Sequence, residues 1–72
     1  MERVYTVIYE KGKTGWGAYV PDLPGCVAAG RSVEEVKALM PAAIKMHIEG
    51  MIEDGVEVPE PASQAERITV AA

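Results

Sequence analysis

The first third of the chain holds runs of apolar, β-branched and aromatic residues separated by a polar link, and this pattern predicts β-strands. Residues 3–9 are rich in β-branched and aromatic side chains, which fall alternately on two faces. A polar link with two glycines, residues 10–15, leads to a second strand-like run at residues 16–20, so an antiparallel hairpin is expected. Pro21 ends this run because proline has no N–H to donate. A third strand is predicted from Cys26 to Ala29.

The pattern changes to a helical period after Gly30. Ser32 can cap a helix, and Glu35 can reach back to the Ser32 amide. An apolar stripe follows at helical spacing and consists of Val33, Val36, Leu39, Met40, Ala43, Ile44, His47, Ile48 and Met51. Gly55 suits a left-handed cap, so the helix is predicted from about Val33 to Asp54. Pro41 lies inside this span and predicts a kink or two abutting helices.

The remaining residues are expected to be extended. Prolines restrict Val58-Pro59-Glu60-Pro61, and Ile68-Thr69-Val70 is expected to form a short final strand. The predicted fold class is therefore α+β, with a three-stranded antiparallel sheet followed by one long helix and a short final strand. A length of 72 residues fits one domain, residues 1–72, and is small enough that self-association is expected to add stability.

The charge of the chain bears on its partners. The net charge is −4, and the excess of acids lies after residue 31. An acidic surface repels phosphate backbones and attracts basic proteins, so no direct binding of nucleic acid is expected. The N-terminus enters a strand pattern without the features of a signal peptide, and no apolar run is long enough to span a membrane. A cytoplasmic protein is expected.

A search for catalytic or metal-binding groups yields none. The strand region holds only three acids, Glu2, Glu10 and Asp22, which are too few for the carboxylate cluster of a ribonuclease H type nuclease. No glycine motif for binding phosphate or a dinucleotide occurs, so no cofactor is expected. The aromatic residues lack the basic groove of a base-stacking platform. The sequence therefore favours a protein that is not an enzyme and holds no metal.

Two residues have both a chemical and a structural interpretation. His47, the one histidine, could be a general base, but no nucleophile motif accompanies it, so a packed ring is favoured. Cys26, the one cysteine, can form no internal disulfide, and a small buried hydrophobe is favoured over a redox role.

Two segments carry a family resemblance. The run GAYVPDLPGC at residues 17–26 and the run GRSVEE at residues 30–35 resemble the hallmark segments of the HicB antitoxin family. The similarity continues to VPEP at residues 58–61 and so covers about residues 5 to 61. It implies a partial RNase H-like fold without the catalytic acids. It also implies an antitoxin that binds and masks a small, basic, mRNA-cleaving toxin of the HicA type. Full-length members usually continue into a DNA-binding segment, and operator binding is not expected of this chain.

The resemblance, together with the turn, the neighbouring aromatic residues and the acidic charge, predicts a partner-binding site. Its expected residues are Trp16, Tyr19, Asp22, Leu23, Pro24 and Gly25. The structural alternative is that Asp22 bonds the local backbone while Pro24 and Gly25 only form a type II turn. The alternative function is a stand-alone homo-oligomeric binding domain with no cognate toxin. A homodimer or homotetramer is expected under either function.

Overall fold

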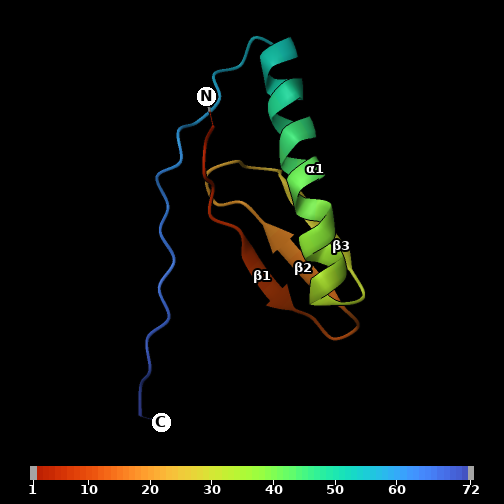
Figure 1. Ribbon diagram of the computed structural model, residues 1–72, viewed down its shortest axis with the longest axis vertical. Coiled ribbons are helices and arrows are strands. Elements are labelled where there is room, and N and C mark those ends of the chain that lie inside the picture. The colour runs from red at the N-terminus through yellow and green to blue at the C-terminus, as the bar shows by residue number, and fades with distance from the viewer. Residues whose placement is uncertain (1, 72) are drawn as a thin grey trace.

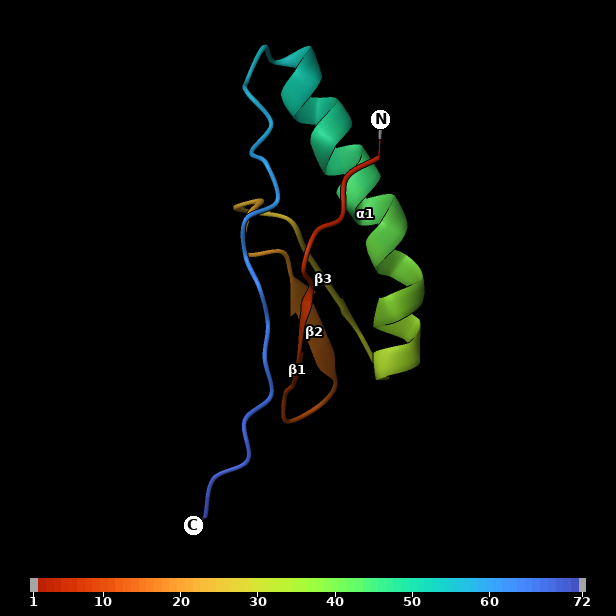
Figure 2. The same ribbon diagram turned by 60° about the vertical axis from the view of Figure 1, so that its left-hand side comes forward.

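A computed structural model describes residues 2–71 and shows a sheet covered by one helix. The strands are β1 (Ile8–Lys11), β2 (Trp16–Tyr19) and β3 (Val27–Gly30), and the helix is α1 (Val33–Glu53). The sheet is antiparallel in the order β1-β2-β3, and α1 lies across one of its faces (Figures 1 and 2). The predicted α+β class, the three-stranded antiparallel sheet and the long helix are confirmed.

The strands begin later than the pattern predicts. Residues 3–7 are extended but stand outside the ladder, which starts at Ile8. The third strand starts at Val27 rather than Cys26, because the Cys26 N–H donates to the Leu23 carbonyl at 3.0 Å and so closes the preceding turn.

The register assigns side chains to the two faces of the sheet. Ala18 of β2 is buried and pairs with Tyr9 on one side and Ala28 on the other, so this row faces α1. The neighbouring row consists of Ile8, Tyr19 and Val27. We call the surface formed by this second row the open face, because α1 covers the opposite face (Figure 2).

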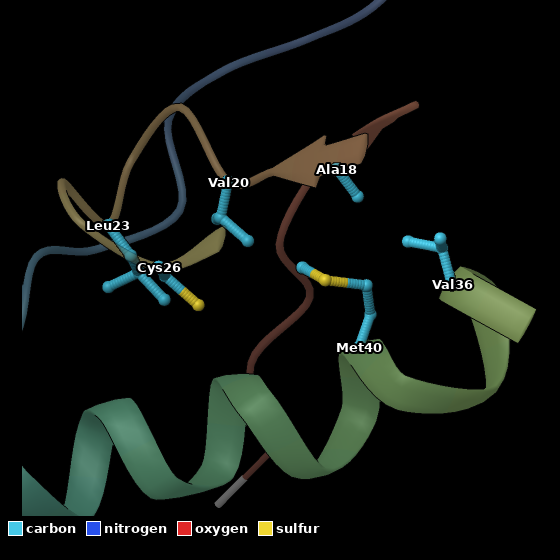
Figure 3. Packing of buried hydrophobic residues seen from close by; sticks show 6 residues of the cluster. All are labelled: Ala18, Val20, Leu23, Cys26, Val36 and Met40. Carbon is cyan, nitrogen blue, oxygen red and sulfur yellow. The ribbon is translucent and has the colours of Figure 1, made fainter. Parts of the chain in front are cut away.

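The core lies between the sheet and the first half of α1. Its fully buried residues are Ala18, Val20, Leu23, Cys26, Val36 and Met40 (Figure 3). The Met40 side chain extends from α1 into the space between Val20 and Val36. Full burial of a valine, leucine or methionine side chain contributes about 1.5–3 kcal/mol, and Val20, Leu23, Val36 and Met40 are of this size.

Both ends of α1 carry the predicted caps, Ser32 and Gly55, whereas among the described residues Glu35 makes no hydrogen bond back to the Ser32 amide. The Ser32 Oγ accepts a hydrogen bond from the Glu35 N–H at 3.1 Å, which satisfies one free donor of the first turn. At the other end Gly55 has a φ of +70°, its N–H donates to the Ile52 carbonyl, and the Val56 N–H donates to the Met51 carbonyl. This pair of bonds is a Schellman cap, which requires the left-handed residue that glycine supplies.

Pro41 does not divide the helix. A single helix runs through it, so the expectation of two abutting helices is wrong. Pro41 and Lys37 are both exposed. The Lys37 carbonyl, which would have accepted the missing N–H, therefore lies on the solvent side, where water can satisfy it.

The segment after α1 is extended without being a strand. The final strand expected at Ile68–Val70 is wrong, since the structure assigns none there, and Ile68 and Val70 are 72% and 73% exposed. The chain runs past residues 3–6 and then diverges from β1 (Figure 1). It thus leaves the edge at which it could have formed a ladder.

Replacing Pro41 by alanine is expected to stabilise the protein. The Pro41→Ala change restores one helical hydrogen bond and removes a steric clash, for an expected gain of about 1–3 kcal/mol in the free energy of unfolding. Urea denaturation followed by circular dichroism measures it. The control is Lys45→Ala, at another exposed position of α1, which should change stability by less than about 0.5 kcal/mol. An unchanged or lower stability of the Pro41 variant would contradict this account.

Candidate partner-binding surface

The loop between β2 and β3, residues 20–26, is closed by three backbone hydrogen bonds. The Leu23 N–H donates to the Val20 carbonyl, the Cys26 N–H to the Leu23 carbonyl and the Val20 N–H to the Cys26 carbonyl, at 3.0, 3.0 and 3.2 Å. Gly25 has a φ of +87°, which belongs to the third position of a type II turn. The predicted turn at Pro24-Gly25 is therefore present.

Leu23 points into the protein from this loop. Its side chain is 0% exposed and belongs to the same core as Met40 and Cys26 (Figure 3). A side chain in this position has no surface to offer a partner while the fold is intact. Pro24 and Gly25, which follow it, are exposed at the tip of the turn.

Asp22 points the other way and binds the end of the chain. One carboxylate oxygen accepts hydrogen bonds from the Ala62 and Ser63 N–H groups at 3.0 and 2.9 Å, and the other accepts from the Ser63 hydroxyl at 2.8 Å. These bonds, led by that from the Ser63 N–H, lower the pKa of Asp22 below its ordinary value. Asp22 therefore accepts hydrogen bonds from the backbone, as the structural alternative predicts. The backbone groups lie some 40 residues away, however, and not in the local turn.

Asp22 is one of several anchors for residues 58–63, which we call the strap. The Tyr5 hydroxyl donates to the Pro59 carbonyl at 2.7 Å, and the Thr6 hydroxyl donates to the Ser63 carbonyl at 2.9 Å. The Arg3 guanidinium adds longer bonds to the same stretch and an exposed ion pair with Glu60 at 3.3 Å. Side chains, rather than a β-ladder, therefore hold the strap beside residues 3–6.

Trp16 and Tyr19 fall on opposite faces of the sheet. They stand three residues apart on β2, and successive side chains of a strand alternate. Trp16 is half-buried and packs against the core on the side of α1, whereas Tyr19 is 39% exposed on the open face. Tyr19 is flanked there by its cross-strand partners Ile8 and Val27, and Val27 is 65% exposed. The predicted residues therefore do not form one continuous surface.

His47 packs beside the turn at Gly25, and Cys26 belongs to the core. The Gly25 Cα faces the His47 ring, so that a Cβ there would lie 3.6 Å from Cε1. Cys26 and His47 line a shallow hollow of about 380 Å³ between the turn and α1, together with Val27 and Met46. Burial raises the pKa of the Cys26 thiol, which keeps it protonated and unreactive at neutral pH.

Residues 2–71 contain neither a cluster of metal ligands nor a helix that could span a membrane. Among these residues, no three histidine, cysteine or carboxylate side chains lie close enough together to hold a metal ion. The helix in this part of the chain is not long and apolar enough to cross a lipid bilayer.

Comparison with known proteins identifies relatives of this chain. The profile of one protein family, described as "HicB_like antitoxin of bacterial toxin-antitoxin system", matches residues 5–71. The chain is 42% identical over 57 residues to an "Uncharacterized 14.9 kDa protein in rep-hol intergenic region" of Haemophilus phage HP1, covering 79% of this chain and 43% of the phage protein. It is 32% identical over 62 residues to "Antitoxin HicB 2" of Photorhabdus laumondii, covering 86% of this chain and 45% of that protein.

A third relative has a similar length. It is "UPF0150 protein Ta0767" of Thermoplasma acidophilum, 36% identical over 67 residues, which make up 92% of this chain and 94% of that protein. The chain thus spans less than half the length of the phage and Photorhabdus proteins but nearly all of the Thermoplasma one.

The Asp22→Asn variant is expected to loosen the strap while leaving the sheet and α1 intact. The amide of asparagine is uncharged, so the hydrogen bonds from the Ala62 and Ser63 N–H groups lose the strength that a carboxylate gives them, and the Ser63 hydroxyl must change from donor to acceptor. Hydrogen exchange should become faster at the Ala62 and Ser63 amides and stay unchanged in β2. The control is Asp54→Asn at an exposed carboxylate outside the strap. Unchanged exchange at both strap amides would contradict the assignment.

Acidification is expected to release the strap from Asp22 at low pH. Because the hydrogen bonds depress the pKa of Asp22 in the folded protein, the stability they contribute is fully present above the ordinary value of 3.8 and is lost as the pH falls through the lower folded value. An NMR titration of the Asp22 carboxyl carbon and the Ser63 amide reports this transition. In Ser63→Ala, which lacks the hydroxyl donor, the midpoint should shift upward toward 3.8. A wild-type midpoint at or above 3.8 would disprove the effect.

Proposed function

The chain belongs to the HicB-like antitoxin family, and we propose that it acts as the antitoxin of a toxin–antitoxin pair by binding and masking a small, basic, mRNA-cleaving toxin of the HicA type. The observation that carries the proposal is the family match over residues 5–71, which includes the whole sheet, α1 and the strap. Masking requires a stable surface that fits the toxin, and it requires no reacting group in the antitoxin.

The charge of the chain supports a basic partner. The net charge is −4, and the exposed side of α1 contributes Glu34, Glu49 and Glu53. Complementary charge speeds the encounter of two proteins and disfavours wrong partners more than it adds affinity. The same charge disfavours contact with the phosphates of DNA or RNA, so operator binding is not expected of these residues.

The open face offers the best contact surface among the predicted residues. Tyr19 is partly exposed between Ile8 and Val27, and tyrosine is enriched among the residues that dominate binding energy at protein interfaces. Pro24 and Gly25 are exposed at the neighbouring end of the sheet. We therefore keep Tyr19, Pro24 and Gly25 as toxin contacts and assign Leu23 and Asp22 to support of the fold.

One observation favours a second candidate function, a stand-alone homo-oligomeric binding domain. The Thermoplasma relative matches this chain over 94% of its own length, so a protein of this size occurs without a further domain. Such a protein would bind through the same surfaces without a cognate toxin.

Co-expression with the protein of the neighbouring reading frame tests the proposal. The two proteins should elute together in size-exclusion chromatography, and the complex should stop mRNA cleavage by the partner. Tyr19→Ala should raise the Kd by about tenfold or more, because truncating an interface tyrosine commonly costs over 1 kcal/mol. Ile52→Ala, which removes an exposed side chain of α1 away from the open face, should leave the Kd unchanged. Separate elution of the two proteins would favour the stand-alone domain.

A further inference from the structure

The turn at Pro24-Gly25 is held by two side chains that point in opposite directions. Leu23 is 0% exposed and fixes the loop to the core, while the Asp22 carboxylate fixes it to the strap through three hydrogen bonds of 2.8–3.0 Å. Figure 2 shows the strap passing beside this loop. Pro24 directly follows both residues and is exposed. The position of the exposed tip therefore depends on the strap as well as on the core.

The strap is attached less firmly than the core residues are. Among the described residues no β-ladder joins it to the sheet, and the hydrogen bonds that hold it each involve a side chain. A segment held by a few partly exposed bonds opens locally at a small cost in free energy, without global unfolding. Pro59 and Pro61 restrict the released strap, so little entropy is lost when it docks again. Docked and released states therefore form an equilibrium that a partner can shift.

We propose that the strap is a switch for toxin binding at this turn, an inference that rests on the proposed function. With the strap docked, Asp22 and Leu23 together fix Pro24 and Gly25 in the conformation that the toxin meets. With the strap released, Leu23 alone holds the loop, and the tip gains freedom that toxin binding must then remove. The docked form therefore binds the toxin more tightly.

The coupling acts in both directions. A toxin that prefers the docked form stabilises docking by the same factor by which docking strengthens toxin binding. The turn keeps its three backbone hydrogen bonds and the buried Leu23 in both states, so only part of its order depends on the strap. A factor of about five to ten, at the lower end of usual couplings, is therefore expected.

Ser63→Asp releases the strap without altering the turn itself. The change removes the hydroxyl that donates to Asp22 and sets a second carboxylate against the first, so like charges oppose docking. Gln64→Asp adds the same charge at the next position, which is exposed, and serves as the matched control. Attraction of a basic toxin by the added charge occurs in both variants, so the difference between them isolates the effect of the strap.

Hydrogen exchange in the free protein tests whether the strap orders the turn. The Leu23 and Cys26 amides donate within the turn and should exchange about fivefold faster or more in Ser63→Asp than in Gln64→Asp. The Met40 amide of α1 should be unchanged, which shows that the fold is intact. The proposal is overturned if the Ala62 amide stays protected in Ser63→Asp, or if it is released while both turn amides keep their wild-type exchange. This measurement involves no toxin and is independent of the proposed function.

Binding of the protein from the neighbouring reading frame tests the coupling. The Kd of Ser63→Asp should lie about five- to tenfold above that of Gln64→Asp, and in the wild-type complex the Ala62 amide should exchange more slowly by a similar factor. Equal Kd values, or an Ala62 amide that the complex leaves unchanged, would reject the switch. An absence of binding by the wild type would instead contradict the proposed function, and the free-protein measurement would still decide whether the strap orders the turn.

Discussion

The structure depends on the burial of one face of α1 against a three-stranded sheet. Val36 and Met40 of α1 and Leu23 of the loop are 0–1% exposed, and the other buried residues gather around them. A domain of this size has little other apolar surface to remove from water. The positions of the helix, of the loop and of both faces of the sheet all follow from this contact.

The loop at residues 20–26 connects the core to the end of the chain. Gly25 allows the tight turn, Leu23 faces inward and adds to the core, and Asp22 faces outward and holds Ala62 and Ser63. A segment that reads as a partner-binding motif therefore also supports the fold. Its conformation fixes where the strap lies beside residues 3–6, which precede β1.

The sequence predicts local features of this fold well and long-range features poorly. The Ser32 cap, the turn at Pro24-Gly25 and the end of the helix before Gly55 each rest on the conformations of a few adjacent residues. The bonds from Asp22 to the strap join residues about 40 positions apart, and no periodicity announces such a contact. The prediction of a final strand was wrong, because Ile68–Val70 has the composition of a strand but no neighbouring strand to pair with. Composition alone cannot supply that neighbour.

The candidate site also combines a feature that the sequence predicts with one that it does not. The separation of Trp16 from Tyr19 follows from their spacing on one strand, so the alternation of side chains was sufficient to predict it. The burial of Leu23 beside an exposed Pro24 could not be predicted in this way, because the loop has no regular period and its side chains are directed by the turn and by α1.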